Sequence, residues 1–117
     1  MKIGELSAAS GVSVRSLRYY EDQRLLTSTR LDNGYREYSP LAVEQVRTIQ
    51  LYLTLGLSTE QISSFLHCVL KNKEAFCAEV LPIYERKLKE IDDQIVELTQ
   101  LRTNLIDRIR SIREEQS

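Results

Sequence analysis

Side chains suited to binding nucleic acid gather on a short predicted helix over residues 14–22. Its outward side chains are Arg15, Ser16, Arg18 and Tyr19. Two arginines near a helix N-terminus, where backbone amides are also unpaired, suit phosphate oxygens and the guanine edges of a major groove. The alternative interpretation is a solvated amphipathic face that binds nothing.

A predicted hairpin over residues 29–38 supplies a second group. Its turn at residues 32–34 (Asp-Asn-Gly) contains residue types that tolerate positive φ, and short candidate strands flank it. Tyr35 and Arg36 follow the turn, where they could donate hydrogen bonds to a phosphate backbone. Tyr38 fits contact with DNA and packing on the core equally well. The hairpin predicts the wing of a DNA-binding domain.

A helix-turn-helix over about residues 4–22 would position the first group. Leu6 and Ala9 lie at helical spacing, and Gly11 permits a tight turn after them. Ser13 is a typical N-cap, since its hydroxyl can accept a hydrogen bond from a free amide of the next helix. The two helices together predict a reader of duplex DNA.

Two further helices are expected after the hairpin. Ser39 and Pro40 are a typical N-cap and first helical residue, which predicts a helix over residues 40–55. Residues 58–61 (Ser-Thr-Glu-Gln) form a capping-box pattern for a helix over residues 59–70. The expected inward side chains of the first of these helices are Val43, Val46, Ile49 and Leu53, with Tyr52 as a further candidate.

A long helix from Pro82 to Glu115 is the last predicted element. Its apolar side chains recur mostly at steps of three and four, as a coiled-coil seam requires. From Tyr84 onward they are Leu88, Ile91, Ile95, Leu98, Leu101, Leu105, Ile109 and Ile112. Such a helix is about 51 Å long, more than a head of about 70 residues can cover, so a second copy is expected to bury the stripe. Pro82 suits a first turn, whereas a helix capped by Asn72 would be kinked there.

These features resemble the mercury-resistance regulator (MerR) family over almost the whole chain. The matching motifs are Ile3-Gly4-Glu5-Leu6, Gly11-Val12-Ser13, Leu17-Arg18-Tyr19-Tyr20-Glu21 and Gly34-Tyr35-Arg36-x-Tyr38, followed by the long C-terminal helix. The predicted fold class is mainly α: a winged helix-turn-helix head with a two-stranded wing, two further helices and a long C-terminal coiled-coil dimerisation helix. Residues 1–71 are expected to form the DNA-binding head, and residues 72–117 the hinge and dimerisation helix.

The resemblance implies a sequence-specific transcriptional regulator without enzymatic activity. Its homodimer, with antiparallel dimer helices, would bind a pseudo-palindromic promoter site and bend and untwist the DNA for RNA polymerase. The two middle helices would carry strain between the DNA reader and the dimer helix. A pure repressor is equally compatible with the residues, and no separate ligand-binding domain is expected. The residues carried over to DNA contact are Arg15, Ser16, Arg18, Tyr19, Tyr35, Arg36 and Tyr38.

Cys77 lies where metal-sensing members of the family place their first cysteine, at the start of the dimer helix. In those proteins the other soft ligands follow that helix, but here no cysteine or histidine follows Cys77, and only His67 and Cys68 precede it. We therefore expect no metal site and no cofactor. Cys77 is a candidate sensor of a thiol-reactive or other small stress signal. The alternative is that both cysteines are packing residues.

Composition narrows the function classes further. The formal net charge is −1, with seven Lys/Arg against six Asp/Glu in residues 1–56 and nine against eleven in residues 57–117. This excludes a protein that coats nucleic acid through bulk charge, so affinity must depend on a few well-placed arginines.

The absence of a glycine-rich phosphate loop and the single histidine argue against an enzyme. No signal peptide or apolar run of about 20 residues is found, so we expect a cytoplasmic protein with no membrane partner. The alternative function is a coiled-coil interaction or adaptor protein that has lost DNA binding.

Overall fold

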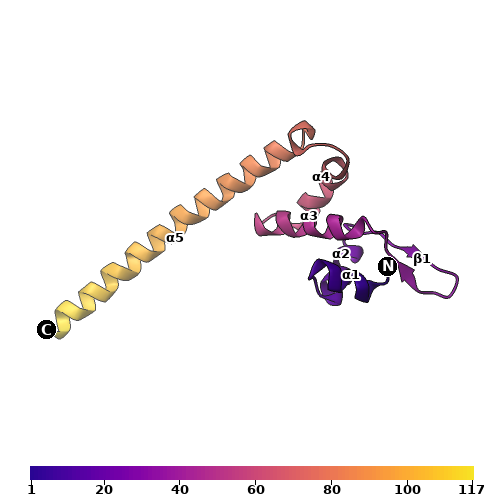
Figure 1. Ribbon diagram of the computed structural model, residues 1–117. Helices are drawn as coiled ribbons and strands as arrows, with labels where there is room; N and C mark the ends of the chain where they lie inside the picture. Colours follow the sequence, from indigo (N-terminus) through magenta and orange to yellow (C-terminus); the bar gives the residue numbers. More distant parts are fainter. The chain divides into compact units, whose positions relative to one another are not determined.

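The computed structural model describes all 117 residues and divides them into two compact units, Met1–Leu81 and Pro82–Ser117. The elements are the helices α1 (Ile3–Ser10) and α2 (Val14–Asp22), the strands β1 (Thr29–Arg30) and β2 (Arg36–Glu37), the helices α3 (Ala42–Thr54) and α4 (Thr59–Lys71), the 3-10 helix η1 (Glu74–Phe76) and the helix α5 (Val80–Gln116). Figure 1 shows the β-hairpin projecting from the helices of the first unit. The predicted fold class, a mainly helical chain with a small wing and a long last helix, is confirmed.

Helices α1 and α2 form the predicted helix-turn-helix. Gly11 ends α1 with a φ of 76°, and its amide donates to the carbonyl of Ser7 at 2.9 Å. Ser13 caps α2, since its hydroxyl accepts a hydrogen bond from the Ser16 amide at 3.1 Å. Leu17 is fully buried, and α1 packs against both α2 and α3. One face of α2 is therefore fixed in the core, which leaves the opposite face free for a ligand.

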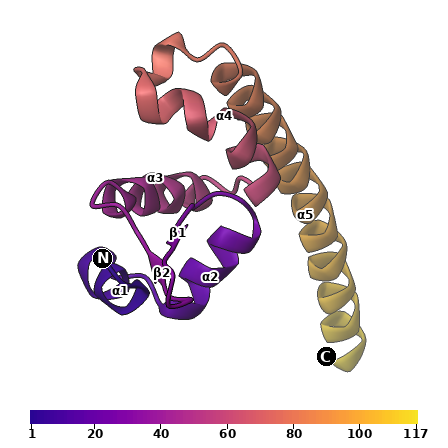
Figure 2. The same cartoon turned by 90° about the vertical axis from the view of Figure 1, so that its right-hand side faces the viewer.

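The core of the first unit draws on α1 to α4 and on the segments that flank the hairpin. Its largest fully buried side chains are Tyr38, Phe65, Leu6, Leu17, Leu25, Leu26, Ile49, Ile62 and Val46. Tyr52 is also buried, which confirms its place on the inward stripe of α3, and its ring meets Phe65 edge-on with centroids 4.9 Å apart. Val43 and Leu53, predicted on the same stripe, are only half-buried. In Figure 2, α3 lies between α4 and the helix-turn-helix, so it connects the two parts of the core.

Helix α3 begins at Ala42, two residues later than predicted. The Ser39 hydroxyl accepts a hydrogen bond from the Leu41 amide at 3.2 Å, and the Ser39 carbonyl accepts one from the Ala42 amide at 2.9 Å. These short-range bonds form a turn, and the α-helical ladder starts only where the Gln45 amide donates to Leu41. Pro40 has no amide to donate, so it fits this turn without losing a hydrogen bond.

Helix α4 begins with the predicted capping box. The Gln61 amide donates to the Ser58 hydroxyl at 3.1 Å, and the Ser58 amide donates to Gln61 Oε1 at 2.9 Å. Asn72 ends α4 rather than capping a new helix, and its amide donates to the carbonyl of Cys68 at 2.9 Å. Residue 72, where the hinge was predicted to begin, lies inside the first compact unit.

Helix α5 is continuous over 37 residues, about 55 Å at 1.5 Å per residue. It begins at Val80, so Pro82 lies in its first turn, where a backbone donor is not needed. Most of the predicted apolar stripe is exposed, with Leu101 at 54% and Ile109 at 47%, whereas Tyr84 and Ile91 are half-buried. No α5 side chain after Val80 is buried. None of the helices combines the length and the apolar character needed to cross a membrane.

Candidate DNA-binding surface

Helix α2 presents three of the predicted contact side chains to solvent. Arg15, Arg18 and Tyr19 are all exposed. Neither arginine forms an ion pair within the chain, so both guanidinium groups remain available to an anion. Ser16 is half-buried, and its hydroxyl accepts a hydrogen bond from the Ser13 hydroxyl at 3.0 Å. Ser16 therefore stiffens the start of α2 and is less available to a ligand than the sequence suggested.

The turn of the wing leaves Tyr35 exposed to solvent. Gly34 has a φ of 85°, a region that glycine enters without a steric penalty. The Asn33 side chain accepts a hydrogen bond from the Tyr35 amide at 3.1 Å, which fixes the start of the returning strand. Tyr35 is 64% exposed, and the Lys2 ammonium lies 5.7 Å from the centre of its ring. Lys2 is a cation near the wing that the sequence analysis did not single out.

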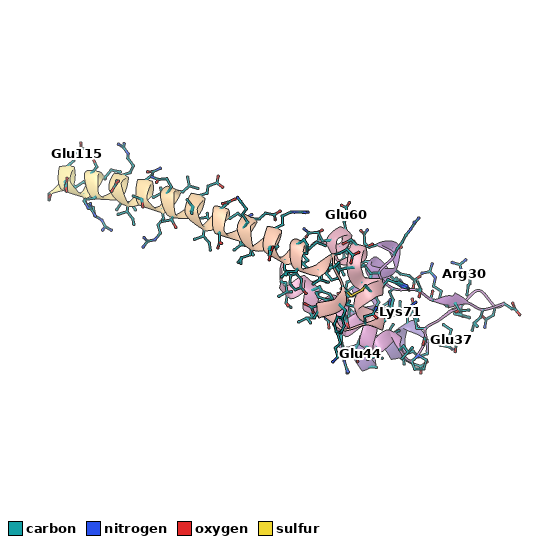
Figure 3. The ribbon with its side chains drawn as sticks, turned by 90° about the horizontal axis from the view of Figure 1, so that it is seen from above. Arg30, Glu37, Glu44, Glu60, Lys71 and Glu115 are labelled. Carbon is teal, nitrogen blue, oxygen red and sulfur yellow. A yellow bond between two sulfur atoms is a disulfide. The ribbon has the colours of Figure 1, made fainter.

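Antiparallel pairing sets Arg30 on β1 opposite Arg36 on β2. Figure 3 shows Arg30 and Glu37 on the projecting hairpin. Arg30 is exposed and forms no ion pair, so the wing carries a second cation that sequence reasoning missed. The signal was present in the sequence, because a hairpin centred on the predicted turn brings these two positions together.

Glu21 joins α2 to the wing. Its carboxylate forms an ion pair with Arg36 and accepts a hydrogen bond from the Tyr38 hydroxyl at 2.5 Å. Burial of the Tyr38 hydroxyl, followed by its hydrogen bond to Glu21, raises the pKa of Tyr38 above its ordinary value of 10.0. Tyr38 is 1% exposed, so the expectation of a direct DNA contact from it is revised: its ring packs in the core and its hydroxyl orients Glu21. Glu21 was part of the resemblance motif, but its role depends on a contact 15 residues away along the chain.

An open groove of about 880 Å³ lies between the helix-turn-helix and the wing. Arg18 from α2 and Arg36 from β2 both line it, together with Lys2, Asp22 and Tyr35. The fold therefore brings cations of the recognition helix and the wing to one concave surface. Arg15 and Tyr19 do not line this groove and extend the exposed face of α2 beyond it.

The two cysteines are joined, which the sequence analysis did not predict. Cys68 on α4 and Cys77 after η1 form a disulfide with their Cα atoms 6.0 Å apart, and no cysteine is free. Cys77 was singled out alone as a candidate sensor, and this pairing places Cys68 beside it; a sensor role for Cys77 stays a prediction. No group of three or more His, Cys, Asp or Glu side chains lies close enough together to hold a metal ion. His67 is exposed on α4, beside Cys68 in sequence.

Comparison with known protein families gives two overlapping matches. The model described as MerR HTH family regulatory protein matches residues 1–67, and the model described as MerR, DNA binding matches residues 43–108. The HTH-type transcriptional regulator HmrR of Rhizobium leguminosarum bv. viciae is 41% identical to this chain over 105 residues, which cover 90% of this chain and 81% of the relative.

Two solved structures share the fold. The transcription regulator PbrR691 from Ralstonia metallidurans CH34, in complex with lead(II), superposes with a TM-score of 0.79 at 24% identity, over 92% of this chain and 83% of that one. HiNmlR, a MerR family regulator lacking the sensor domain and bound to promoter DNA, gives a TM-score of 0.58 at 24% identity, over 86% of this chain and 76% of that one. The family matches and the extensive identity to HmrR decide the assignment: the chain belongs to the MerR family, and it is a DNA-binding transcriptional regulator rather than an enzyme.

Proposed function

We propose that the protein acts as a homodimer that binds a pseudo-palindromic promoter site and controls transcription by distorting the promoter DNA. The observation that carries this proposal is the shared groove, in which Arg18 of the recognition helix and Arg36 of the wing line one surface. A recognition helix reads base edges in the major groove while neighbouring cations bind phosphates and set the register. The solved relative HiNmlR is bound to promoter DNA, which supports the same class of target here.

Each contact residue has a role in this proposal that follows from its place. Arg15 and Arg18 bind guanine edges or phosphates from α2, with Tyr19 beside them. Tyr35 and Arg36 donate to the phosphate backbone next to the groove. Glu21 binds the Arg36 guanidinium, and the Arg36 side chain remains 42% exposed, so part of it is still accessible to a phosphate. Tyr38 supports this surface through its hydrogen bond to Glu21, and Ser16 is bonded to Ser13 at the start of α2.

A second copy of this chain is the proposed cover for the apolar stripe of α5. Most of the stripe is exposed between Leu88 and Ile112, about 36 Å of helix, and exposed apolar surface of this extent is typical of an interface. A two-fold dimer carries two recognition helices, so the operator should contain two half-sites related by a dyad and separated by whole helical turns of about 34–36 Å. RNA polymerase is the proposed further partner, because promoter distortion acts through it.

The signal in this proposal is a thiol-reactive or other small stress agent. Cys68 and Cys77 are the only cysteines, and they lie together at the end of the first unit. No cluster of metal-ligand side chains competes with them as a sensor.

Selection of genomic DNA fragments by the purified, reduced protein, followed by sequencing, tests the proposed function. The proposal predicts enrichment of a pseudo-palindrome within a promoter spacer. Arg15→Ala/Arg18→Ala should retain no enriched sequence, because both unpaired guanidinium groups of α2 are then lost. Lys89→Ala, which removes an exposed cation from α5, should retain the same fragments as the unmodified protein. Enrichment no greater than random DNA would favour the adaptor function instead.

A further inference from the structure

Cys68 and Cys77 enclose the last connection before α5. Cys68 lies in the final turn of α4, Cys77 follows η1, and two residues separate Cys77 from Val80, the first residue of α5. Figure 3 draws the sulfur atoms near Lys71. The disulfide therefore closes a short loop that contains the whole of η1.

The loop has few other anchors. Between residues 72 and 81 only Cys77 and Val80 are buried, and Phe76 is 77% exposed. The Tyr52 hydroxyl of α3 donates a long hydrogen bond to the Glu74 carboxylate of η1, at 3.4 Å. The disulfide is thus a main restraint on this connection, and its loss should free the backbone there.

The two sulfur atoms have different surroundings. Cys68 is half-buried, and the side-chain amide of Asn72 lies 3.8 Å from its sulfur, where it can support a thiolate. Cys77 is 4% exposed, and its sulfur lies 3.8 Å from the Lys73 carbonyl, which would accept from a reduced thiol. The more accessible, amide-supported Cys68 is suited to attack an oxidant, and Cys77 is suited to resolve the product.

We propose that Cys68 and Cys77 form a reversible two-cysteine switch whose oxidant is a hydroperoxide and whose disulfide restrains the connection into α5. The Cys68 thiolate attacks a peroxide oxygen and breaks the O–O bond, which gives Cys68 sulfenic acid and releases water or an alcohol. The Cys77 thiol then displaces hydroxide from the sulfenic sulfur, which forms the S–S bond and releases water. Two thiols lose two electrons and one peroxide gains them, and a low-molecular-weight dithiol reverses the reaction by exchange.

This inference specifies the signal of the proposed function and rests on it for its effect on DNA. In a dimer joined through α5, each connection determines how freely a DNA-binding head can adjust to its half-site. Oxidation should therefore change operator binding while leaving the groove around Arg18 and Arg36 intact, because those residues belong to other elements of the head.

The test compares the full chain after reduction with dithiothreitol, and after removal of the reductant and treatment with hydrogen peroxide. Thiol titration should find two free thiols per chain in the reduced protein and none in the oxidised protein, with an intramolecular link between the two cysteines in peptide mass spectra. Cys77→Ala, which adds no polar group to the buried site, should stop at a sulfenic acid on Cys68 that dimedone traps. Cys68→Ser should react with peroxide at least tenfold more slowly than Cys77→Ala.

Two readouts then separate the switch from the proposed function. Amide hydrogen exchange should be slower at residues 72–81 in the oxidised chain than in the reduced chain. The double variant Cys68→Ser/Cys77→Ala should not show this difference. Equal exchange rates in both states of the unmodified protein would overturn the switch, whatever the protein's binding to DNA. Operator affinity should differ at least fivefold between the two states of the unmodified protein and should not respond to peroxide in the double variant. Equal operator affinity in both states would also overturn the switch. If the reduced protein enriches no DNA, the proposed function is contradicted, and the hydrogen-exchange result alone decides whether the switch exists.

Discussion

Glu21 of the recognition helix is ion-paired with Arg36 of the wing. The other oxygen of the same carboxylate accepts a hydrogen bond from the buried Tyr38 hydroxyl, so a residue of the core anchors the pair. Charge-assisted bonds of this kind are directional and resist displacement when partly buried. The recognition helix and the wing are therefore held in one arrangement, and a DNA duplex meets both surfaces already positioned.

Removal of Arg18 or Arg36 should weaken operator binding. Arg18→Ala should leave thermal stability unchanged, because Arg18 forms no ion pair, whereas Arg36→Ala should also lower it, because Glu21 loses its partner. Each contact to a base or phosphate contributes about 1–3 kcal/mol, so Arg18→Ala is expected to lower affinity about tenfold or more. Arg36→Ala should also reduce the salt dependence of binding, because a phosphate contact releases counterions. Affinity measured by fluorescence anisotropy at several salt concentrations gives both quantities.

The matched control for these variants is Lys89→Ala, which removes an exposed cation whose partner is Asp93 on the same helix. Its operator affinity should equal that of the unmodified protein. Unchanged affinity in both Arg18→Ala and Arg36→Ala would contradict the assignment of this face.

Alkaline pH should destabilise the head through Tyr38. Because the pKa of Tyr38 is raised above 10.0 in the folded chain, its contribution to stability is complete below pH 10 and is lost as the pH rises through the folded-state pKa. At pH 8, Tyr38→Phe should be less stable than the unmodified protein by about 1–2 kcal/mol, because it lacks the hydrogen bond to Glu21. Between pH 8 and pH 11, its free energy of unfolding should fall by less than that of the unmodified protein. Urea unfolding between pH 8 and pH 11 measures both effects. Parallel curves for the two proteins would show that Tyr38 does not titrate as the structure requires.

The two phenylalanines should differ sharply in their importance for stability. Phe65 is 1% exposed and packs against Tyr52, so Phe65→Ala should cost about 3–5 kcal/mol in the free energy of unfolding. Phe76 is 77% exposed, and Phe76→Ala should change stability by less than about 0.5 kcal/mol. Denaturant unfolding at one fixed protein concentration measures both changes. Equal losses in the free energy of unfolding would contradict the burial of Phe65 in the core.

A charge in the α5 stripe should dissociate the proposed dimer. Leu101→Glu introduces a carboxylate into the seam, and burial of an unpaired charge is strongly unfavourable. Val96 is also exposed but lies roughly 140° around the helix from Leu101, off the stripe, so Val96→Glu should leave assembly unchanged. Sedimentation equilibrium decides between these outcomes: two variants with the same mass in solution would argue against a seam at Leu101.

The local elements of this fold can be predicted because their stabilising contacts are short-range. Ser13 and Ser58 cap helices through amides three residues away, and Gly11 and Gly34 adopt the positive φ that their turns require. Sequence patterns record such contacts directly. The predicted start of α3 was less accurate, because small differences in hydrogen bonding decide whether residues 39–41 form a turn or the first residues of the helix.

The tertiary parts of the site could not be predicted in the same way. The pairs Glu21–Arg36 and Cys68–Cys77 depend on how separate elements pack, and neither spacing identifies the partner. Burial of Tyr38 likewise depends on the whole head, which is why the sequence left two interpretations open for it.

Hydroxyl-radical footprinting on the selected operator shows whether a dimer reads DNA through the groove between α2 and the wing. We expect two equivalent groups of protected sugars, related by a dyad and one or more helical turns apart, each with contacts from a recognition helix and a wing. At the same protein concentration, Arg18→Ala/Arg36→Ala should protect neither half-site. A single unsymmetrical footprint, or a footprint that the double variant reproduces, would contradict the claim that a dimer reads DNA through this groove.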